Sequence, residues 1–246
     1  MTSQRRIREV SSPAANPLTR DSGGDNLPPG LRLQILTTEH WSLLSTRALS
    51  WNEAFSRATM FLSALSGAVV ALALVAGATT FDRGFVTFAL FLLPVVLFAG
   101  VATFVRLVEI NHEDVGWVIG MNRLRHAYLE AAPDLRPYFV TGSYDDEPGI
   151  MATFGATVGP GGFAHAFITT PGLIAVVDGV LAGAIAAIVG IYTGLDTRLA
   201  LGLAVGAALV TVSLLVSYQF RRVVRPRGLE KPRFPEGQTG SSATNR

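Results

Sequence analysis

The chain has 246 residues, of which 49% are hydrophobic and only 15% are charged, and its mean hydropathy is +0.39. A soluble domain usually carries charge on about a quarter of its residues, so this composition excludes an ordinary soluble domain and indicates a membrane protein. Cysteine is absent, which excludes disulfide bonds and thiolate metal sites, and the net charge of +2 carries little information by itself.

The first 57 residues are predicted to lie outside the membrane. Residues 1–30 mix Ser, Pro, Asn, Gly and charges without a period, which is typical of a disordered tail. Its basic residues are not followed by an apolar core, so it does not look like a signal peptide. Residues 31–57 are predicted to form a cytoplasmic helix, because apolar side chains recur there at steps of three and four: Trp41, Leu44, Ala48, Trp51 and Phe55.

Four apolar runs, at 58–79, 85–105, 172–194 and 199–220, are long enough to cross a membrane. A bilayer core of roughly 30 Å needs about 20 apolar residues in a helix. None of the runs alternates polar and apolar residues as a transmembrane strand does. The fold is therefore predicted to be all-α, with four transmembrane helices. Short connections after the first and third runs favour two antiparallel hairpins, and Pro94 is expected to kink the second helix.

The distribution of Lys and Arg predicts the orientation. Seven of these residues precede the first run, four lie between 106 and 136, and seven follow residue 220, whereas the two short connections carry only Arg83 and Arg198. Basic residues concentrate on the cytoplasmic side, so both termini and the central segment are predicted to be cytoplasmic. A single lysine among twenty basic residues, with many Ala, Gly and Val, is typical of a high-GC bacterial gene. The predicted location is the bacterial cytoplasmic membrane.

The second helix is predicted to continue into the cytoplasm over residues 106–132, where Pro133 ends it. A stripe at steps of three and four is expected to face residues 31–57, and it includes one acid, Asp114, expected to pair with Arg47, Arg57 or Trp51. The members of this stripe are Leu107, Ile110, Asp114, Trp117, Met121, Leu124 and Tyr128.

Glu109, His112 and Glu113 stand close together at the start of this continuation. A Glu-x-x-His step occurs in di-iron bundles, but such a site needs matching motifs on two helices. The favoured interpretation is a solvated collar around a helix that leaves the lipid. Arg106 would mark the headgroup level, where a long cationic side chain reaches the interface and contacts lipid headgroups.

Residues 133–171 are predicted to be irregular and to lie in the cytoplasm or at the interface, with an acidic turn at Asp145, Asp146 and Glu147. Residues 221–246 are predicted to be a basic, disordered tail. Beside a membrane, such a basic cluster attracts anionic lipid headgroups. Nucleic acid is not expected as a partner, because the tail is short and has one aromatic residue. The residues predicted to contact headgroups here are Arg221, Arg222, Arg225 and Arg227.

Small residues in the third and fourth runs predict close helix packing, which in lipid depends on small side chains. Gly179, Gly183 and Gly190 are expected to face Gly202 and Gly206. A general abundance of Gly and Ala is the alternative explanation.

Asp178 is the one carboxylate within an apolar run, and intramembrane acids are candidates for functional sites. Folding the third run onto the fourth places Asp178 level with Ser213, and Ser217 lies one turn further on. These three residues form a candidate intramembrane polar site. Two roles remain open at this point, structural anchoring and the handling of protons or ions.

Two stretches, "LQILTTEHWSLLSTRALSWNEAFSRATMFLSALSG" and "GMNRLRHAYLEAAPDL", resemble uncharacterised multi-pass membrane proteins of actinobacteria. The resemblance covers about residues 31–150 and implies no activity. The plan of a helix followed by a hairpin resembles, more loosely, the two-span effectors thought to act as pores in bacterial conflict systems.

The sequence contains no combination of nucleophile and base and no metal-ligand motif, so neither an enzyme nor a cofactor is expected. The first functional hypothesis is a scaffold or signalling module whose cytoplasmic helices bind another protein or a second copy of the chain. The alternative is a subunit of a pore or transporter that uses Asp178 and the glycines of the last two runs.

Overall fold

The computed structural model describes residues 27–79, 81–154, 169–223 and 232–236. Within these residues every regular element is helical, so the prediction of an all-α protein is confirmed. Predictions for residues 1–26, 155–168, 224–231 and 237–246 lie outside the described part. The elements are α1 (Pro29–Thr79), α2 (Arg83–Ala131), the 3-10 helix η1 (Pro133–Tyr138), α3 (Glu147–Phe154), α5 (Thr170–Tyr192) and α6 (Thr197–Val223).

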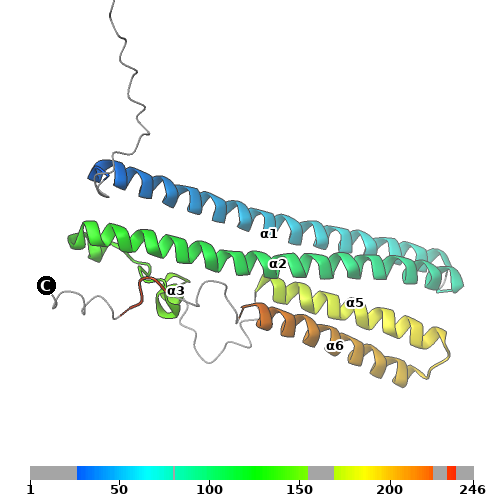
Figure 1. Ribbon diagram of the computed structural model, residues 1–246. Coiled ribbons are helices and arrows are strands. Elements are labelled where there is room, and N and C mark those ends of the chain that lie inside the picture. The colour runs from blue at the N-terminus through cyan, green and yellow to red at the C-terminus, as the bar shows by residue number, and fades with distance from the viewer. Residues whose placement is uncertain (1–26, 80, 155–168, 224–231, 237–246) are drawn as a thin grey trace, which may run out of the picture.

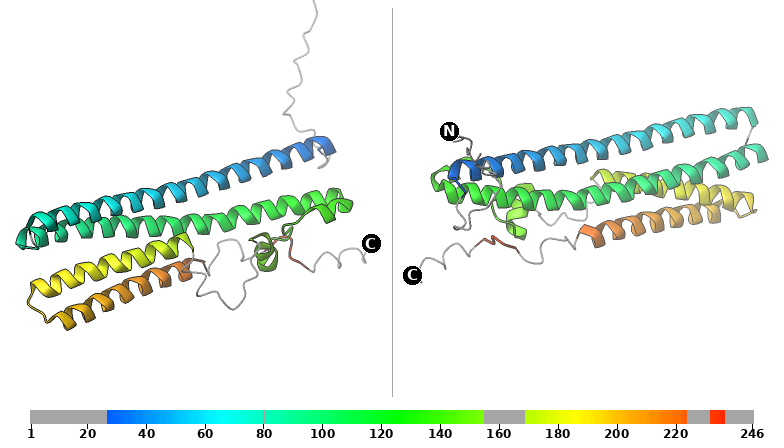
Figure 2. Two further views of the ribbon diagram at one scale, coloured as in Figure 1. Left: turned by 180° about the vertical axis from the view of Figure 1, so that it is seen from behind. Right: turned by 45° about the horizontal axis from the view of Figure 1, so that its top comes forward.

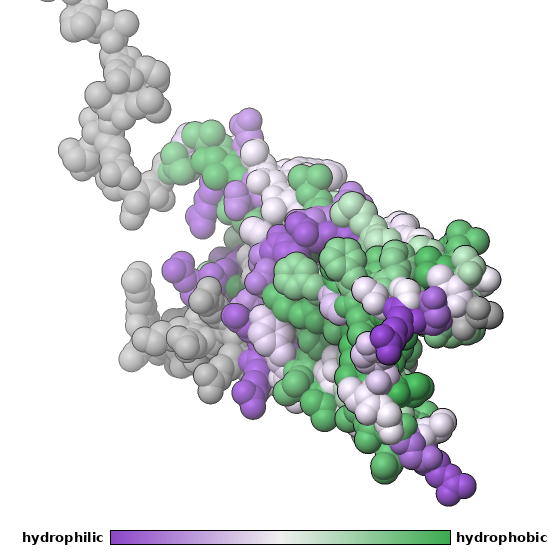
Figure 3. Space-filling model, turned by 90° about the vertical axis from the view of Figure 1, so that its right-hand side faces the viewer, coloured by the Kyte–Doolittle hydropathy of each residue, from purple (hydrophilic) through white to green (hydrophobic). Residues whose placement is uncertain are grey.

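Four of these helices, α1, α2, α5 and α6, are long and apolar enough to cross a membrane. Little of that apolar surface is used inside the molecule: 11% of the most apolar window of α1 is buried, 22% of that of α2, 39% of that of α5 and 11% of that of α6. In Figure 3 hydrophobic side chains accordingly cover much of the visible surface, with hydrophilic ones scattered between them. Such a surface requires an apolar environment.

Local interactions determine where α2 begins and how the chain turns between α5 and α6. Asp82 caps α2, because its side chain accepts hydrogen bonds from the backbone N–H groups of Gly84 at 2.7 Å and Phe85 at 3.1 Å. α2 then runs through Pro94 without interruption as far as Ala131. Between α5 and α6 the chain turns through Gly194, whose φ of +84° suits a residue without a Cβ. Both connections lie at the same end of the molecule (Figure 1).

α1 and α2 lie side by side, and α5 and α6 lie against only one half of α2 (Figures 1 and 2). Contacts between the helices show that the apolar parts of α1, α2, α5 and α6 lie at the same height along the helix axes. The carboxylate of Asp178 on α5 lies against Gly100 on α2, close to the Phe61 ring on α1. The rings of Phe104 on α2 and Tyr218 on α6 are 6.4 Å apart. The first half of α1 and the second half of α2 project beyond this four-helix region, and we call the projecting pair the extension.

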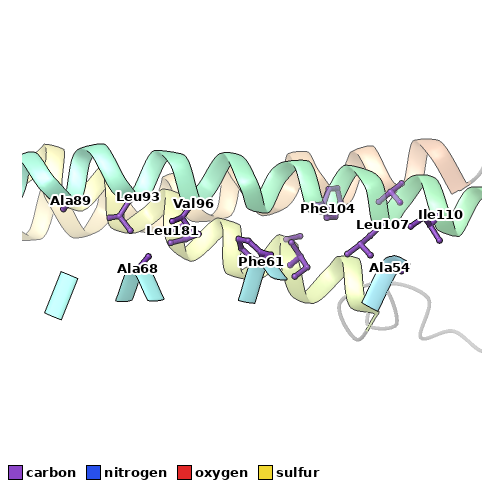
Figure 4. Close-up of a cluster of buried hydrophobic side chains, with 13 residues drawn as sticks. Ala54, Phe61, Ala68, Ala89, Leu93, Val96, Phe104, Leu107, Ile110 and Leu181 are labelled. Atoms are coloured by element: carbon purple, nitrogen blue, oxygen red, sulfur yellow. The ribbon is translucent and has the colours of Figure 1, made fainter. Parts of the chain in front are cut away.

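The core has two parts. The larger cluster joins α1, α2 and α5, and Figure 4 shows its side chains between these helices. The smaller cluster lies within the extension, where Val118, Ile119 and Met121 of α2 pack against Ile150 of α3. The extension therefore has a packed core of its own. The buried members of the larger cluster labelled in Figure 4 are Ala54, Phe61, Ala68, Ala89, Leu93, Val96, Phe104, Leu107, Ile110 and Leu181.

Candidate functional site

A buried ion pair joins the two helices of the extension. Arg47 of α1 donates from Nε and Nη2 to the two carboxylate oxygens of Asp114 at 2.6 and 3.0 Å. Asp114 lies within the buried stripe of α2, and its side chain is only 4% exposed. Of the three partners considered from the sequence, the structure therefore selects Arg47. A bidentate pair of this kind fixes both the spacing and the axial register of the two helices.

The acidic residues at the start of the extension surround one arginine. Arg106 donates to Glu53 at 3.0 and 3.1 Å, to Glu109 at 3.4 Å and to Glu113 at 3.1 Å. Glu109 and Glu113 therefore neutralise the Arg106 guanidinium. In the described part of the chain, no group of three His, Asp or Glu side chains is arranged to hold a metal ion. The Arg106 guanidinium is directed at these acids, and its contact with lipid headgroups remains a prediction.

A fully buried amide holds α3 against α2. The Asn122 side chain donates from Nδ2 to the carbonyl oxygens of Tyr144 at 2.8 Å and Gly149 at 3.0 Å. Its Oδ1 accepts from Arg125 at 2.9 Å and from the Thr153 hydroxyl at 2.7 Å. The backbone carbonyl of Tyr144 leaves no room for a Cβ at Gly149. Asn122 thus satisfies its donors and acceptor while it fixes the segment that carries the acidic turn.

That acidic turn binds the C-terminal part of the chain. Asp145 is fully buried and accepts hydrogen bonds from Arg123 Nε at 2.7 Å and from the backbone N–H groups of Arg233 at 2.9 Å and Phe234 at 2.8 Å. The Asp145 N–H donates in return to the Phe234 carbonyl at 3.3 Å. The Phe234 ring stacks on His126 at 4.5 Å. We call this contact between the acidic turn and residues 232–236 the tail clamp.

The neighbouring acid completes the tail clamp. Asp146 accepts from the Gly149 N–H in the first turn of α3 at 3.1 Å and from the Glu236 N–H at 2.7 Å. Burial of Asp145 opposes its charge, but the hydrogen bonds from Arg233, Phe234 and Arg123 outweigh it and hold the pKa of Asp145 below its ordinary value. Residues 232–236 were expected to be part of a disordered tail, and the structure instead holds them against α2.

The candidate polar site within the apolar region is not assembled as expected. Asp178 is fully buried, and neither of its carboxylate oxygens has a hydrogen-bond partner within the described residues. It lies against Gly100 of α2, where a Cβ would overlap the carboxylate. Ser213 and Ser217 are exposed on α6 and make no hydrogen bond to it. The reason is rotational, because Asp178 is directed at α2 whereas both serines lie outside the contact between α5 and α6.

The glycines of α5 pack against α6, but those of α6 do not face α5. A Cβ at Gly183 would lie 2.8 Å from the Ala204 carbonyl oxygen, and one at Gly190 would lie 3.3 Å from the Ala200 Cβ. Gly179 is similarly close to α6, with the Ala208 carbonyl oxygen 3.1 Å from the position of a Cβ. Nothing lies within 4 Å of a Cβ at Gly202 or Gly206. A row of alanines four residues apart, rather than the expected glycines, is the α6 side of this contact: Ala200, Ala204 and Ala208.

An apolar groove lies at the free end of the extension. It has a volume of about 580 Å³ and lies between the first turns of α1, the end of α2 and η1. His40 stacks on Tyr128 at 5.8 Å in its wall, and the Tyr128 hydroxyl donates to the Leu36 carbonyl at 3.0 Å. The groove is lined by Leu33, Thr37, His40, Trp41, Leu44, Tyr128, Ala131, Ala132, Leu135 and Phe139.

The one titratable base in this wall is uncharged at neutral pH. Burial, and then the charge of the nearby Arg125, hold the pKa of His40 below its ordinary value of 6.5. The groove is therefore an apolar surface, and His40 would give an anionic ligand no electrostatic attraction there.

No family model matches the chain, and neither a curated protein nor a solved structure matches it. Sequence reasoning missed the roles of Asn122 and Gly100. A lone amide inside an apolar stripe and a lone glycine among large apolar residues were the signals available for them, whereas nothing in the sequence linked Asp145 to Phe234.

Proposed function

We propose that the chain is a multi-pass protein of the bacterial cytoplasmic membrane that acts as a non-enzymatic scaffold or signalling module. In this proposal α1 with α2 and α5 with α6 cross the membrane as two antiparallel hairpins, and the extension stands in the cytoplasm. The observation that carries the proposal is the continuity of α1 and α2 from the apolar region into a salt-bridged, packed extension about 40 Å long.

The charge distribution supports this orientation. Arg83 and Arg198 lie at the connections, at one end of the helices, whereas the extension and the end of α6 carry the other basic residues of the four long helices. Arg221 and Arg222 occupy the last turn of α6. By the positive-inside rule the extension faces the cytoplasm, together with both termini.

The scaffold hypothesis is favoured by the surface of the extension. Trp41, Leu49 and Phe55 expose more than half of their surfaces on the part of α1 that also carries charged residues. Large apolar side chains outside the lipid are typical of a surface that binds protein. The extension is held rigid by the Arg47–Asp114 pair and by α3, so it presents this surface in a fixed shape.

The proposal is tested by crosslinking in native membranes followed by identification of the captured proteins. Full-length protein is expected to yield a specific partner or a dimer, and a variant lacking residues 31–55 is expected to yield neither while it remains in the membrane. Labelling of single cysteines introduced at Thr38 and at Asp196 is the topology control. An impermeant thiol reagent added to intact cells should modify only the second site, and modification of the first would refute the orientation.

A pore or transporter subunit is the second candidate function, and the unpartnered Asp178 carboxylate is the observation that favours it. The close packing of the α5 glycines is evidence against this candidate. Gly179, Gly183 and Gly190 contact the backbone and side chains of α6 directly, so they close the space between the helices instead of lining a path. The test is ion flux in liposomes. Loss of a measurable flux in the Asp178→Asn variant would establish this candidate, and absence of flux in the unaltered protein would remove it.

A further inference from the structure

The α1 stripe, which we define as Trp41, Leu44, Ala48, Trp51 and Phe55, has coiled-coil spacing but is mostly exposed instead of being buried against α2 as expected. Trp41 is 66% exposed, Leu44 42% and Phe55 57%. The contact of α1 with α2 instead runs through Arg47, Ala54 and Phe61. Steps of three and four along a helix produce a straight seam that another helix can cover with knobs-into-holes packing. The stripe is thus an unoccupied seam outside the proposed lipid-embedded region.

The charges of this part of α1 are kept away from the stripe. Successive residues of a helix are rotated by about 100°, so the stripe occupies a sector of about 80°. The five charged residues fall in a separate sector of about 120°, where Arg47 and Glu53 already bond to side chains of α2. On the outward flank of the stripe stand Thr38, Ser45 and Asn52, which are uncharged. The five charged residues are Arg32, Glu39, Arg47, Glu53 and Arg57.

An uncharged sector suits contact with an identical helix. Two copies in one membrane have the same orientation, so their α1 helices run parallel and each stripe residue meets its own counterpart. Any charge inside such a contact would face the same charge and repel it. A different partner imposes no such restriction, because it could carry the opposite charge. The absence of charge from both the stripe and its outward flank therefore favours a second copy over another protein.

The apolar groove extends the same surface. Trp41 and Leu44 belong both to the stripe and to the wall of the groove, which continues across to Tyr128 and Leu135. A helix laid along the stripe would cover the opening of the groove and could place large apolar side chains in its volume of about 580 Å³. The stripe and the groove together thus form one apolar surface for a single helix.

We propose that the α1 stripe is the interface of a parallel homodimer, in which α1 of a second copy covers the stripe and the adjoining groove. The inference rests on the proposed cytoplasmic placement of residues 31–57 and names the partner that the scaffold uses. The dimer has two-fold symmetry about an axis along the membrane normal, so the extensions of both copies stand side by side.

Single-cysteine crosslinking in native membranes tests the dimer, and the chain offers a clean background because it contains no cysteine. A disulfide needs Cα atoms closer than about 7 Å. When a thiol oxidant is added to the membranes, Leu44→Cys, Ala48→Cys and Phe55→Cys are expected to give at least fivefold more disulfide dimer than the controls Glu39→Cys and Arg57→Cys, which are also exposed. Equal crosslinking of stripe and control positions, none at the stripe, or crosslinks only to another protein would overturn the homodimer.

A charge-pair test separates direct self-contact from random proximity. Ala48→Glu and Ala48→Arg each place like charges against one another, so each variant alone is expected to lose the dimer. Copies carrying the two substitutions, expressed together with different tags, are expected to co-purify. A dimer that survives either substitution alone, or a mixed pair that fails to co-purify, would contradict the interface. Labelling of the Glu39→Cys control, which lies outside the stripe, by a permeant but not an impermeant thiol reagent separately checks the proposed cytoplasmic placement.

Discussion

Asp114, Asp145 and Asp178 are all nearly or fully buried, but they differ in the groups that donate hydrogen bonds to them. Asp114 has a guanidinium, Asp145 has two backbone N–H groups and an arginine, and Asp178 has no hydrogen bond within the described residues. The sequence predicted the partner of Asp114 as one of three residues, Arg47, Arg57 or Trp51, of which Arg47 is the one observed. It could not predict that of Asp145, whose partner Phe234 is 89 residues away.

The tail clamp gives a prediction at this scale. Asp145→Asn removes a charged acceptor of two backbone N–H groups, so the amide protons of Arg233 and Phe234 should exchange with solvent at least tenfold faster at pH 7. Charge-assisted hydrogen bonds contribute about 1.5–3 kcal/mol each. Hydrogen exchange with mass spectrometry measures this change. Asp146→Asn is the matched control, since it should affect Glu236 and leave Arg233 and Phe234 protected.

The same clamp predicts a pH dependence. The pKa of Asp145 lies below its ordinary value, so the docked tail favours the ionised acid. Docking should therefore be fully stable above about pH 4 and should weaken as the pH falls further, through the lowered pKa. Protection of residues 233 and 234 that is already lost at pH 6 would contradict this assignment.

At the scale of elements, two stripes with the same spacing differ in burial. The stripe of α2 is mostly buried, with Leu107, Ile110 and Met121 at most 2% exposed, whereas the α1 stripe is mostly exposed. Spacing identifies the face of a helix that is apolar, but it does not identify what covers that face. The same limit applies to α6, where the sequence pointed to its glycines and the contact uses its alanines.

The contact between α5 and α6 gives the element-scale prediction. Gly183→Val places a branched side chain against the Ala204 carbonyl and should lower the free energy of unfolding by about 1–3 kcal/mol through overpacking. Gly206→Val changes the same residue type on the other helix at an open position, so it should cost less than about 1 kcal/mol. Thermal and chemical unfolding in detergent micelles would compare them. Equal destabilisation of the two variants would show that the contact is not as described.

At the scale of the whole molecule, hydrophobic run lengths were sufficient to predict an all-α chain with four long apolar helices. The positions of α5 and α6 against α2 were not predictable, because they depend on the small space at Gly100 and on contacts between distant segments. Run lengths report the environment of each helix, whereas the arrangement of helices depends on the shape of their side chains.

The basic end of the molecule gives the last prediction. Replacing Arg221, Arg222, Arg225 and Arg227 by Gln should abolish enrichment of anionic over zwitterionic lipid in the purified protein, since each charge contributes about 1 kcal/mol beside an anionic surface. Quantification of co-extracted lipids by mass spectrometry measures the effect. Arg83→Gln with Arg198→Gln, at the opposite end, is the control and should leave the lipid ratio unchanged. The same loss in that control would refute a specific role for the C-terminal cluster.

The tail clamp also has a consequence for biosynthesis. Phe234 leaves the ribosome 89 residues after Asp145, which at about 5–20 residues per second is a delay of roughly 4–18 seconds. During that interval Asp145 and one face of the His126 ring are not covered by residues 232–236. The clamp can form only after α6 has been translated. A chain truncated before residue 232 never forms it. The clamp therefore forms late in synthesis, and until then Asp145 lacks two of its three hydrogen-bond donors.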